Sequence, residues 1–141
     1  MVLERGDIVS AAKNHVYNAV TPTGSEPIYV VGNPVKVYDN SSVINLNEEA
    51  YEIPAGQNFR VYPLAKGDRF AVADYSIDGS AIAVGDTIGL TAGSRLLAKG
   101  GTTTAFEGKV VKVDMQGAEY FVGQKVDTRI NLITIEVIAN G

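Results

Sequence analysis

The chain contains no cysteine and no tryptophan, and His15 is its only histidine. Without cysteine, disulfides and thiolate sites for zinc or iron–sulfur clusters are excluded, although the cellular compartment is left undecided. A single histidine also excludes the usual multi-histidine metal sites. Because no cysteine, second histidine or nucleophile motif accompanies His15, we interpret it as a surface or interface residue rather than a catalytic base.

Clustered positive charge and long apolar runs are also missing. Twelve Lys and Arg residues against sixteen Asp and Glu give a net charge of −4, and the basic residues are scattered. Since a phosphate backbone is bound by clustered basic residues, we expect no nucleic-acid binding. No apolar run approaches the roughly 20 residues of a membrane span, so we expect no membrane insertion. The N-terminus lacks a signal-peptide core, which predicts synthesis and use in the cytoplasm, or in something assembled there.

What the chain has instead is a Gly-Asp pair that opens short apolar runs, at Gly67, Gly85 and, more weakly, Gly6. Glycine adopts positive φ at little cost and aspartate bonds its own backbone, so the pair is typical of a turn. β-branched and aromatic residues follow at once, which indicates strands entered from tight turns. With 141 residues, the chain is long enough for one domain with a sizeable core.

Strand signals recur at short spacing from residue 28 onward, without the alternation of strands and helices that a parallel α/β fold requires. The predicted fold class is therefore all-β: a small β-barrel or β-sandwich of short antiparallel strands, formed by residues 28–141. Residues 1–27 are predicted to be an extended N-terminal arm and linker, because Pro22 and Pro27 oppose regular structure. Within this arm, the apolar spacing between Ile8 and Val20 allows one or two helical turns.

Three local features refine this prediction. The dipeptide Asp78-Gly79 is typical of a hairpin turn. Alternation slips in the run 106–115, where Val110 and Val111 are both apolar, and Gly108 beside them indicates a bulge or a sharp bend. The segment 128–139 is so apolar that we expect it to be buried on both faces, either centrally or under a partner subunit.

The strongest candidate for a ligand site begins at Asp74. Its oxygen ligands and the glycine that follows match the first half of an EF-hand calcium loop. The twelfth position, which should be a bidentate glutamate, is Gly85, and no helical flanks are predicted. We therefore favour a hairpin turn and keep only a weak calcium candidate, made of Asp74, Ser76, Asp78 and Asp86. No catalytic residue, cofactor or other metal site is predicted.

Turn-and-strand signatures follow one another from Ile53 to Val113, over about half of the chain. They are Ile53-Pro54-Ala55-Gly56, Lys66-Gly67-Asp68-Arg69-Phe70-Ala71-Val72, Val84-Gly85-Asp86-Thr87-Ile88-Gly89-Leu90, Arg95-Leu96-Leu97-Ala98-Lys99 and Gly108-Lys109-Val110-Val111-Lys112-Val113. In this order they resemble the small β-barrel head decoration, or cement, proteins of tailed bacteriophages. The resemblance implies a non-enzymatic virion protein of the capsid surface, made in the host cytoplasm. It also implies a homo-oligomer, often a trimer, that binds the major capsid protein and stabilises the head.

The same resemblance implies an N-terminal arm that reaches across the shell. On that arm we expect partner contacts from Ile8, Val9, His15, Val16 and Tyr17. Two alternatives stay open: another phage structural module, of a tail or fibre, and a β-barrel module that binds carbohydrate or peptide. The second alternative needs an exposed aromatic platform, and the absence of tryptophan counts against it.

Overall fold

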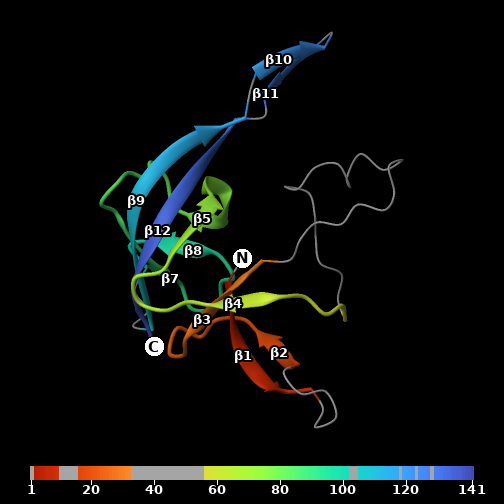
Figure 1. The fold of residues 1–141 in the computed structure, drawn as a ribbon, viewed down its shortest axis with the longest axis vertical. Helices are drawn as coiled ribbons and strands as arrows, with labels where there is room; N and C mark the ends of the chain where they lie inside the picture. Colours follow the sequence, from red (N-terminus) through yellow and green to blue (C-terminus); the bar gives the residue numbers. More distant parts are fainter. Residues whose placement is uncertain are drawn as a thin grey trace.

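The structure is a computed structural model that describes residues 2–9, 16–32, 56–101, 105–117, 119–122, 124–127 and 129–141. In those ranges nearly all regular structure is β-strand, arranged as a four-stranded sheet, a six-stranded sheet and a two-stranded ribbon (Figure 1). A single 3₁₀ turn, η3 (Asp74–Ser76), is the one helical element of the described chain. The six-stranded sheet curls, as in a small barrel or sandwich, so the predicted all-β fold class is confirmed.

The four-stranded sheet contains the N-terminal part of the chain. Its order is β2 (Tyr17–Val20), β1 (Val2–Ile8), β3 (Ile28–Val31) and β4 (Val61–Pro63), and all neighbours are antiparallel. The register between β1 and β2 shifts between Arg5 and Ile8, so Gly6 lies at a bulge within a strand. A Cβ at Gly6 would lie 2.6 Å from Val20 Cγ2, which explains the glycine. The third Gly-Asp pair is therefore not a strand-entry turn.

The six-stranded sheet contains the rest of the body. Its order is β5 (Arg69–Ala73), β12 (Ile130–Asn140), β9 (Phe106–Gln116), β7 (Thr87–Leu90), β8 (Leu97–Lys99) and β6 (Ile77–Asp78). All neighbours are antiparallel except β6 and β8, which are parallel. The predicted hairpin turn at Asp78-Gly79 is therefore wrong. The backbone of Gly79 instead packs against β8, where a Cβ would lie 2.8 Å from Lys99 Cβ.

β9 and β12 form the longest ladder of the molecule, and the ribbon of β10 (Glu119–Val122) and β11 (Gln124–Asp127) extends from its far end (Figure 1). Two register shifts interrupt the ladder. Val111 is an extra residue in β9, and Ile138 is an extra residue in β12. The two shifts cancel, so residues 130–134 and 139–140 of β12 pair with β9 in the same register. Only the segment between the shifts, residues 135–137, is displaced by one residue. The bulge predicted beside Val110 is confirmed.

The Gly-Asp pairs at Gly67 and Gly85 form the same turn twice. In each, the aspartate carboxylate accepts a 2.8 Å hydrogen bond from the N–H of the alanine three residues earlier, and the aspartate N–H donates to that alanine's carbonyl. The glycines have φ of +91° and +97°, as the third position of a type II turn requires. Gly67 N donates to Val137 O of β12, and Gly85 N donates to Val110 O of β9. The prediction that these pairs open strands is confirmed for β5 and β7.

One apolar core joins the two larger sheets. The four-stranded sheet contributes Val2 and Ile28, and the rest of the core consists of Ile77, Ile88, Leu90, Leu97, Phe106, Val110, Ile133, Ile135 and Val137. Strand β12 is central, as predicted, but its second face is only half-buried. The reason is that Thr134 and Glu136 lie on that face, and Glu136 Oε2 accepts a 2.7 Å hydrogen bond from exposed Arg69 Nε.

The segment 1–27 differs from the expected arm. Strand β1 lies between β2 and β3 in the sheet, so the boundary expected at residue 27 would separate β1 from its hydrogen-bonded partner β3. Val2 N donates to Arg95 O at 2.8 Å, and Ala105 N donates to Gly24 O at 3.2 Å, which ties both ends of the segment to the second sheet. The physical reason is burial, because Val2 and Leu3 are 2% and 5% exposed and the hydrophobic effect favours keeping them in the body.

Asn140, at the end of β12, joins the six-stranded sheet to the four-stranded one. Its Oδ1 accepts a 2.8 Å hydrogen bond from Ile28 N, and its Nδ2 donates to Ile28 O at 3.0 Å and to Leu64 O at 2.9 Å. Ile28 begins β3 and Leu64 follows β4, so one amide satisfies three backbone groups of the other sheet. An amide is required here because both a donor and an acceptor are used.

An Asn140→Asp variant tests this link. A carboxylate can still accept from Ile28 N, but it has no N–H for the two carbonyl oxygens, and a buried polar group left unpaired costs about 1–3 kcal/mol. We expect the free energy of unfolding, measured by urea denaturation at pH 7, to fall by about 2 kcal/mol or more. Asn18→Asp in exposed strand β2 is the control, with an expected change below about 0.5 kcal/mol. Equal effects of the two substitutions would contradict the proposed link.

Candidate functional site

The first three predicted calcium ligands lie in η3 and β6. Asp74 and Ser76 are the ends of η3, and Asp78 is an exposed residue of β6. Asp74 Oδ1 accepts a 2.9 Å hydrogen bond from Tyr75 N, and Oδ2 accepts a 3.1 Å hydrogen bond from Asn131 Nδ2. The chain after Asp74 therefore forms a 3₁₀ turn and then a strand, which is not the course of an EF-hand loop.

The fourth candidate, Asp86, is bound elsewhere. Its Oδ2 accepts from Ala83 N at 2.8 Å and forms an ion pair with Lys99 Nζ at 2.8 Å. Lys99 Nζ also donates to Ala81 O at 3.0 Å, and Ala81 has a φ of +51° that non-glycine residues rarely adopt. The hydrogen bond from Lys99, followed by that from Ala83 N, lowers the pKa of Asp86. Lys99 and Asp86 thus hold the loop between β6 and β7 in place.

The four candidate ligands do not assemble a metal site. Across the described ranges, no three His, Cys, Asp or Glu side chains lie close enough together to hold a metal ion. Asp86 already has Lys99 as its counter-ion, and the carboxylate of Asp74 is oriented by Asn131. The calcium candidate is therefore corrected: Asp74 binds Asn131 of β12, Asp86 binds Lys99 of β8, and Asp78 is an exposed residue of β6.

Four of the five predicted partner residues lie on the hairpin of β1 and β2, at or just beyond the strand ends. Ile8, Val9 and Tyr17 are 45%, 50% and 40% exposed, and Val16 is half-buried beside them. Val9 N donates to Val16 O at 2.9 Å, so the pairing of the two strands continues past the end of β1. The guanidinium carbon of Arg5 lies 4.6 Å from the centre of the Tyr17 ring. His15, the remaining predicted partner residue, lies outside the described residues.

A buried glutamate that sequence reasoning did not single out holds the base of this hairpin. Glu4 in β1 is 4% exposed, and its Oε1 accepts from Thr23 N at 2.8 Å and from Gly24 N at 2.9 Å. Thr23 Oγ1 also lies 3.0 Å from Oε2. Two backbone N–H groups and a hydroxyl therefore satisfy the carboxylate, as a buried charge requires. Nothing in the local sequence signals this role, because the partners lie 19 and 20 positions away.

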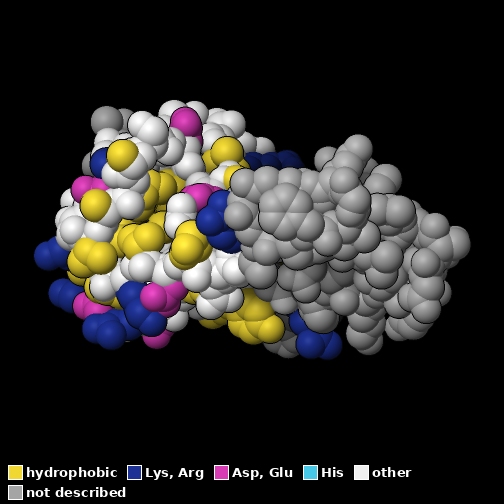
Figure 2. All heavy atoms as spheres, turned by 90° about the horizontal axis from the view of Figure 1, so that it is seen from above, with side chains coloured by type: hydrophobic (Ala, Val, Ile, Leu, Met, Phe, Trp, Pro, Cys, Tyr) yellow, Lys and Arg dark blue, Asp and Glu magenta, His cyan; other side chains and the backbone are white. Residues whose placement is uncertain are grey.

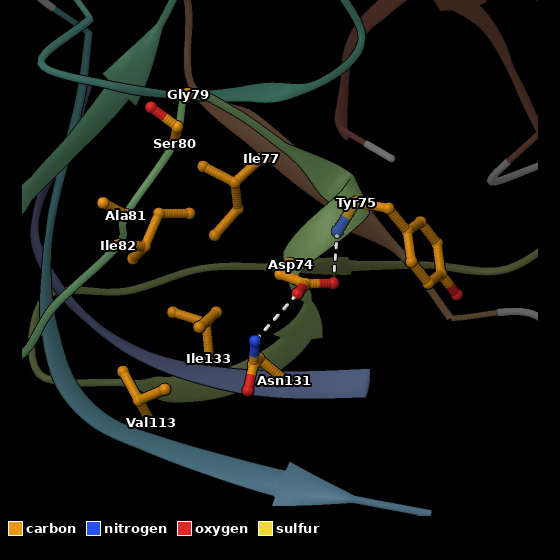
Figure 3. A pocket seen from close by; sticks show the side chains of 10 residues that line it. All are labelled: Asp74, Tyr75, Ile77, Gly79, Ser80, Ala81, Ile82, Val113, Asn131 and Ile133. Atoms are coloured by element: carbon orange, nitrogen blue, oxygen red, sulfur yellow. Dashed lines mark hydrogen bonds between the residues drawn. The ribbon is translucent and has the colours of Figure 1, made fainter. Parts of the chain in front are cut away.

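A hollow of about 490 Å³ lies beside Asp74, between the loop 79–82 and strands β9 and β12 (Figure 3). Its apolar lining includes Ile77, Ile82, Val113 and Ile133. Asp74 and Asn131 lie at one side of it, joined by their hydrogen bond. Sequence reasoning named Asp74 but missed Asn131, although an amide within the apolar run of β12 was an available signal.

Comparison with known proteins gives no match among family models, curated proteins or solved structures. Among the described residues, no helix has the length and apolar character needed to cross a membrane.

The pKa of Asp86 predicts a specific pH dependence. A carboxylate whose pKa is lower in the folded state contributes stability above its unfolded pKa and loses it as the pH falls. We therefore expect acidification below about pH 4 to lower the free energy of unfolding more steeply in the natural protein than in Asp86→Asn. Urea denaturation at pH 7 and at pH 3 measures the difference. Parallel slopes for the natural protein and Asp86→Asn would contradict the prediction.

Proposed function

We propose that this chain is a non-enzymatic structural protein of a bacteriophage virion: a decoration, or cement, protein that binds the lattice of the major capsid protein and stabilises the head. Self-association, with a trimer favoured, belongs to the same proposal. The all-β domain agrees with the fold that the resemblance implies. The observation that carries the proposal is the exposed apolar surface of the hairpin of β1 and β2.

This hairpin surface consists of Ile8, Val9, Tyr17 and Val20, which are 40–50% exposed. Ile8 and Tyr17 pair across the two strands and share one face, whereas Val20 lies on the opposite face of β2, so the apolar side chains lie on both sides of the hairpin. Among the described strands, β2 is at the edge of its sheet, and all four of its residues, Tyr17 to Val20, are exposed and uncharged. Soluble proteins usually protect such an edge with charged residues or proline, because its free backbone groups can pair with another chain. An apolar, uncharged edge therefore supports binding to a protein partner.

Two contacts anchor the base of the hairpin to the body of the protein. The N-terminal end of β1 lies in the core through Val2, and Glu4 fixes the strand to the loop 22–24. A surface that is already ordered loses less conformational entropy on binding, so more of its contact energy appears as affinity.

Other exposed apolar side chains are distributed over the body, and Figure 2 shows hydrophobic groups bordered by charged side chains on one face.

Mass spectrometry of purified particles from the virus that encodes the chain tests the proposal. We expect the protein in particles that carry heads, including heads separated from their tails. Electron microscopy of such heads should show added density at regular positions of the capsid lattice. Absence from every particle would overturn the proposal, and presence on isolated tails alone would support the alternative of a tail or fibre module.

A pair of matched substitutions tests the hairpin surface itself. Val9→Asp places a charge within the proposed contact, where an unpaired buried charge costs more than the about 1–3 kcal/mol of a neutral polar group. We expect its binding to heads, measured by co-sedimentation, to be weaker by about tenfold or more. Val84→Asp is the control, because Val84 is 63% exposed at the turn before β7.

Both variants should fold normally, because exposed substitutions change stability by less than about 0.5 kcal/mol. Equal binding of the two variants would show that the hairpin is not the contact surface.

A further inference from the structure

The hollow beside Asp74 has an aliphatic floor and a charged rim. Figure 3 shows the side chains of Ile77, Ile82, Val113 and Ile133 grouped around a common space, while Asp74 and Asn131 meet at its side. Ile77 and Ile133 are buried in the core, and Ile82 and Val113 are partly buried against it. The floor is therefore a fixed part of the body, and its accessible apolar surface comes mainly from Ile82 and Val113.

The rim carries a negative charge without a cationic partner in the described part of the chain. The ion pairs found there join Arg69 to Glu136, Lys99 to Asp86 and Lys112 to Asp114, and none of them includes Asp74. Asp74 instead accepts one hydrogen bond on each carboxylate oxygen, from Tyr75 N and from Asn131 Nδ2. These bonds fix the direction of the carboxylate and leave lone pairs on both oxygens available.

A side chain that suits both the aliphatic floor and the negatively charged rim of the hollow has an aliphatic stem and a cationic end. Lysine has this construction, since it lays its methylene chain on apolar surface and keeps its ammonium group in contact with water or an anion. Arginine suits the rim less well. Its guanidinium binds best when one lone pair on each carboxylate oxygen is available in a single plane, whereas an ammonium group needs only one of the lone pairs that the bonds from Tyr75 N and Asn131 Nδ2 leave on Asp74.

We propose that this hollow is a docking slot for a lysine side chain on a segment of a partner protein. The lysine stem lies on Ile82 and Val113, and its ammonium group pairs with the Asp74 carboxylate. The chain's net charge of −4 favours the approach of such a basic segment. The slot lies in the six-stranded sheet and the hairpin surface in the four-stranded one, so this inference does not depend on the capsid proposal.

Three matched small probes test the slot on the full chain. They are the Nα-acetyl N-methylamides of lysine, norleucine and arginine, of which norleucine has the aliphatic stem without the ammonium group. Binding is followed by NMR of isotope-labelled isoleucine methyl groups, which reports on Ile77, Ile82 and Ile133 directly. We expect saturable shifts of these signals, with lysine binding about threefold more tightly than norleucine, as for an exposed ion pair.

Two isosteric variants then test whether the advantage of lysine over norleucine depends on Asp74 or on any carboxylate of the protein surface. Asp74→Asn should remove the advantage of lysine over norleucine, and added salt should reduce it. Asp78→Asn removes an exposed carboxylate that does not line the hollow, and it should leave the advantage unchanged.

The proposal is overturned by equal shifts from lysine and norleucine, by tighter binding of arginine, or by no shift at all. It is also overturned if the lysine advantage survives in Asp74→Asn. If that variant does not fold, the comparison of probes on the natural protein decides the matter alone.

Discussion

The ladder between β9 and β12 is the constraint on which the rest of the structure depends. Both Gly-Asp turns attach to its backbone, one to Val137 and the other to Val110. Each attachment is reciprocal, because Val137 N donates to Asp68 O and Val110 N donates to Asp86 O. β5 and β7 therefore start at positions that the ladder sets.

The same ladder also connects the two larger sheets. Ile133 and Ile135 of β12 are 1% and 0% exposed in the shared core. At the end of that strand, the Asn140 side chain binds Ile28, the first residue of β3, and Leu64, which follows β4 in the other sheet. A change that displaced β12 would therefore move the start of β5, the core and the junction of the sheets together.

Local chemistry predicted the turns and many of the strands, because their causes lie within a few residues. Gly67 and Gly85 supply positive φ, and each following aspartate bonds a residue only three positions back. The bulge at Val111 was visible for the same reason, as a break in alternation. Strand pairing was not predictable in this way. β1 pairs with β3, and β6 pairs in parallel with β8. Nothing in the residues near either strand indicates which distant strand it will pair with.

The same limit applies to the candidate sites. The spacing of Asp74, Ser76 and Asp78 predicts only a weak shared calcium site. The side chain that Asp74 binds in the structure is instead Asn131, which lies 57 positions away in the sequence. Asp86 was grouped with Asp74, but Lys99 on β8 determines its environment. The exposed apolar residues Ile8, Val9 and Tyr17 were expected at a contact surface, and the structure places them on one hairpin. The reason for that placement, the burial of Val2 and Glu4 at its base, required the folded chain.

The paired bulges at Val111 and Ile138 have a consequence for the evolution of this sequence. Each adds one residue to one strand, and the second restores the register that the first displaces. Because each bulged residue is unpaired, loss of either one alone would leave every other pair facing its present partner, and only the local bend and twist of the ladder would change. Homologous chains can therefore gain or lose each of these residues separately without moving core side chains to the other face. The two columns of an alignment, 27 positions apart, would gain and lose their gaps independently.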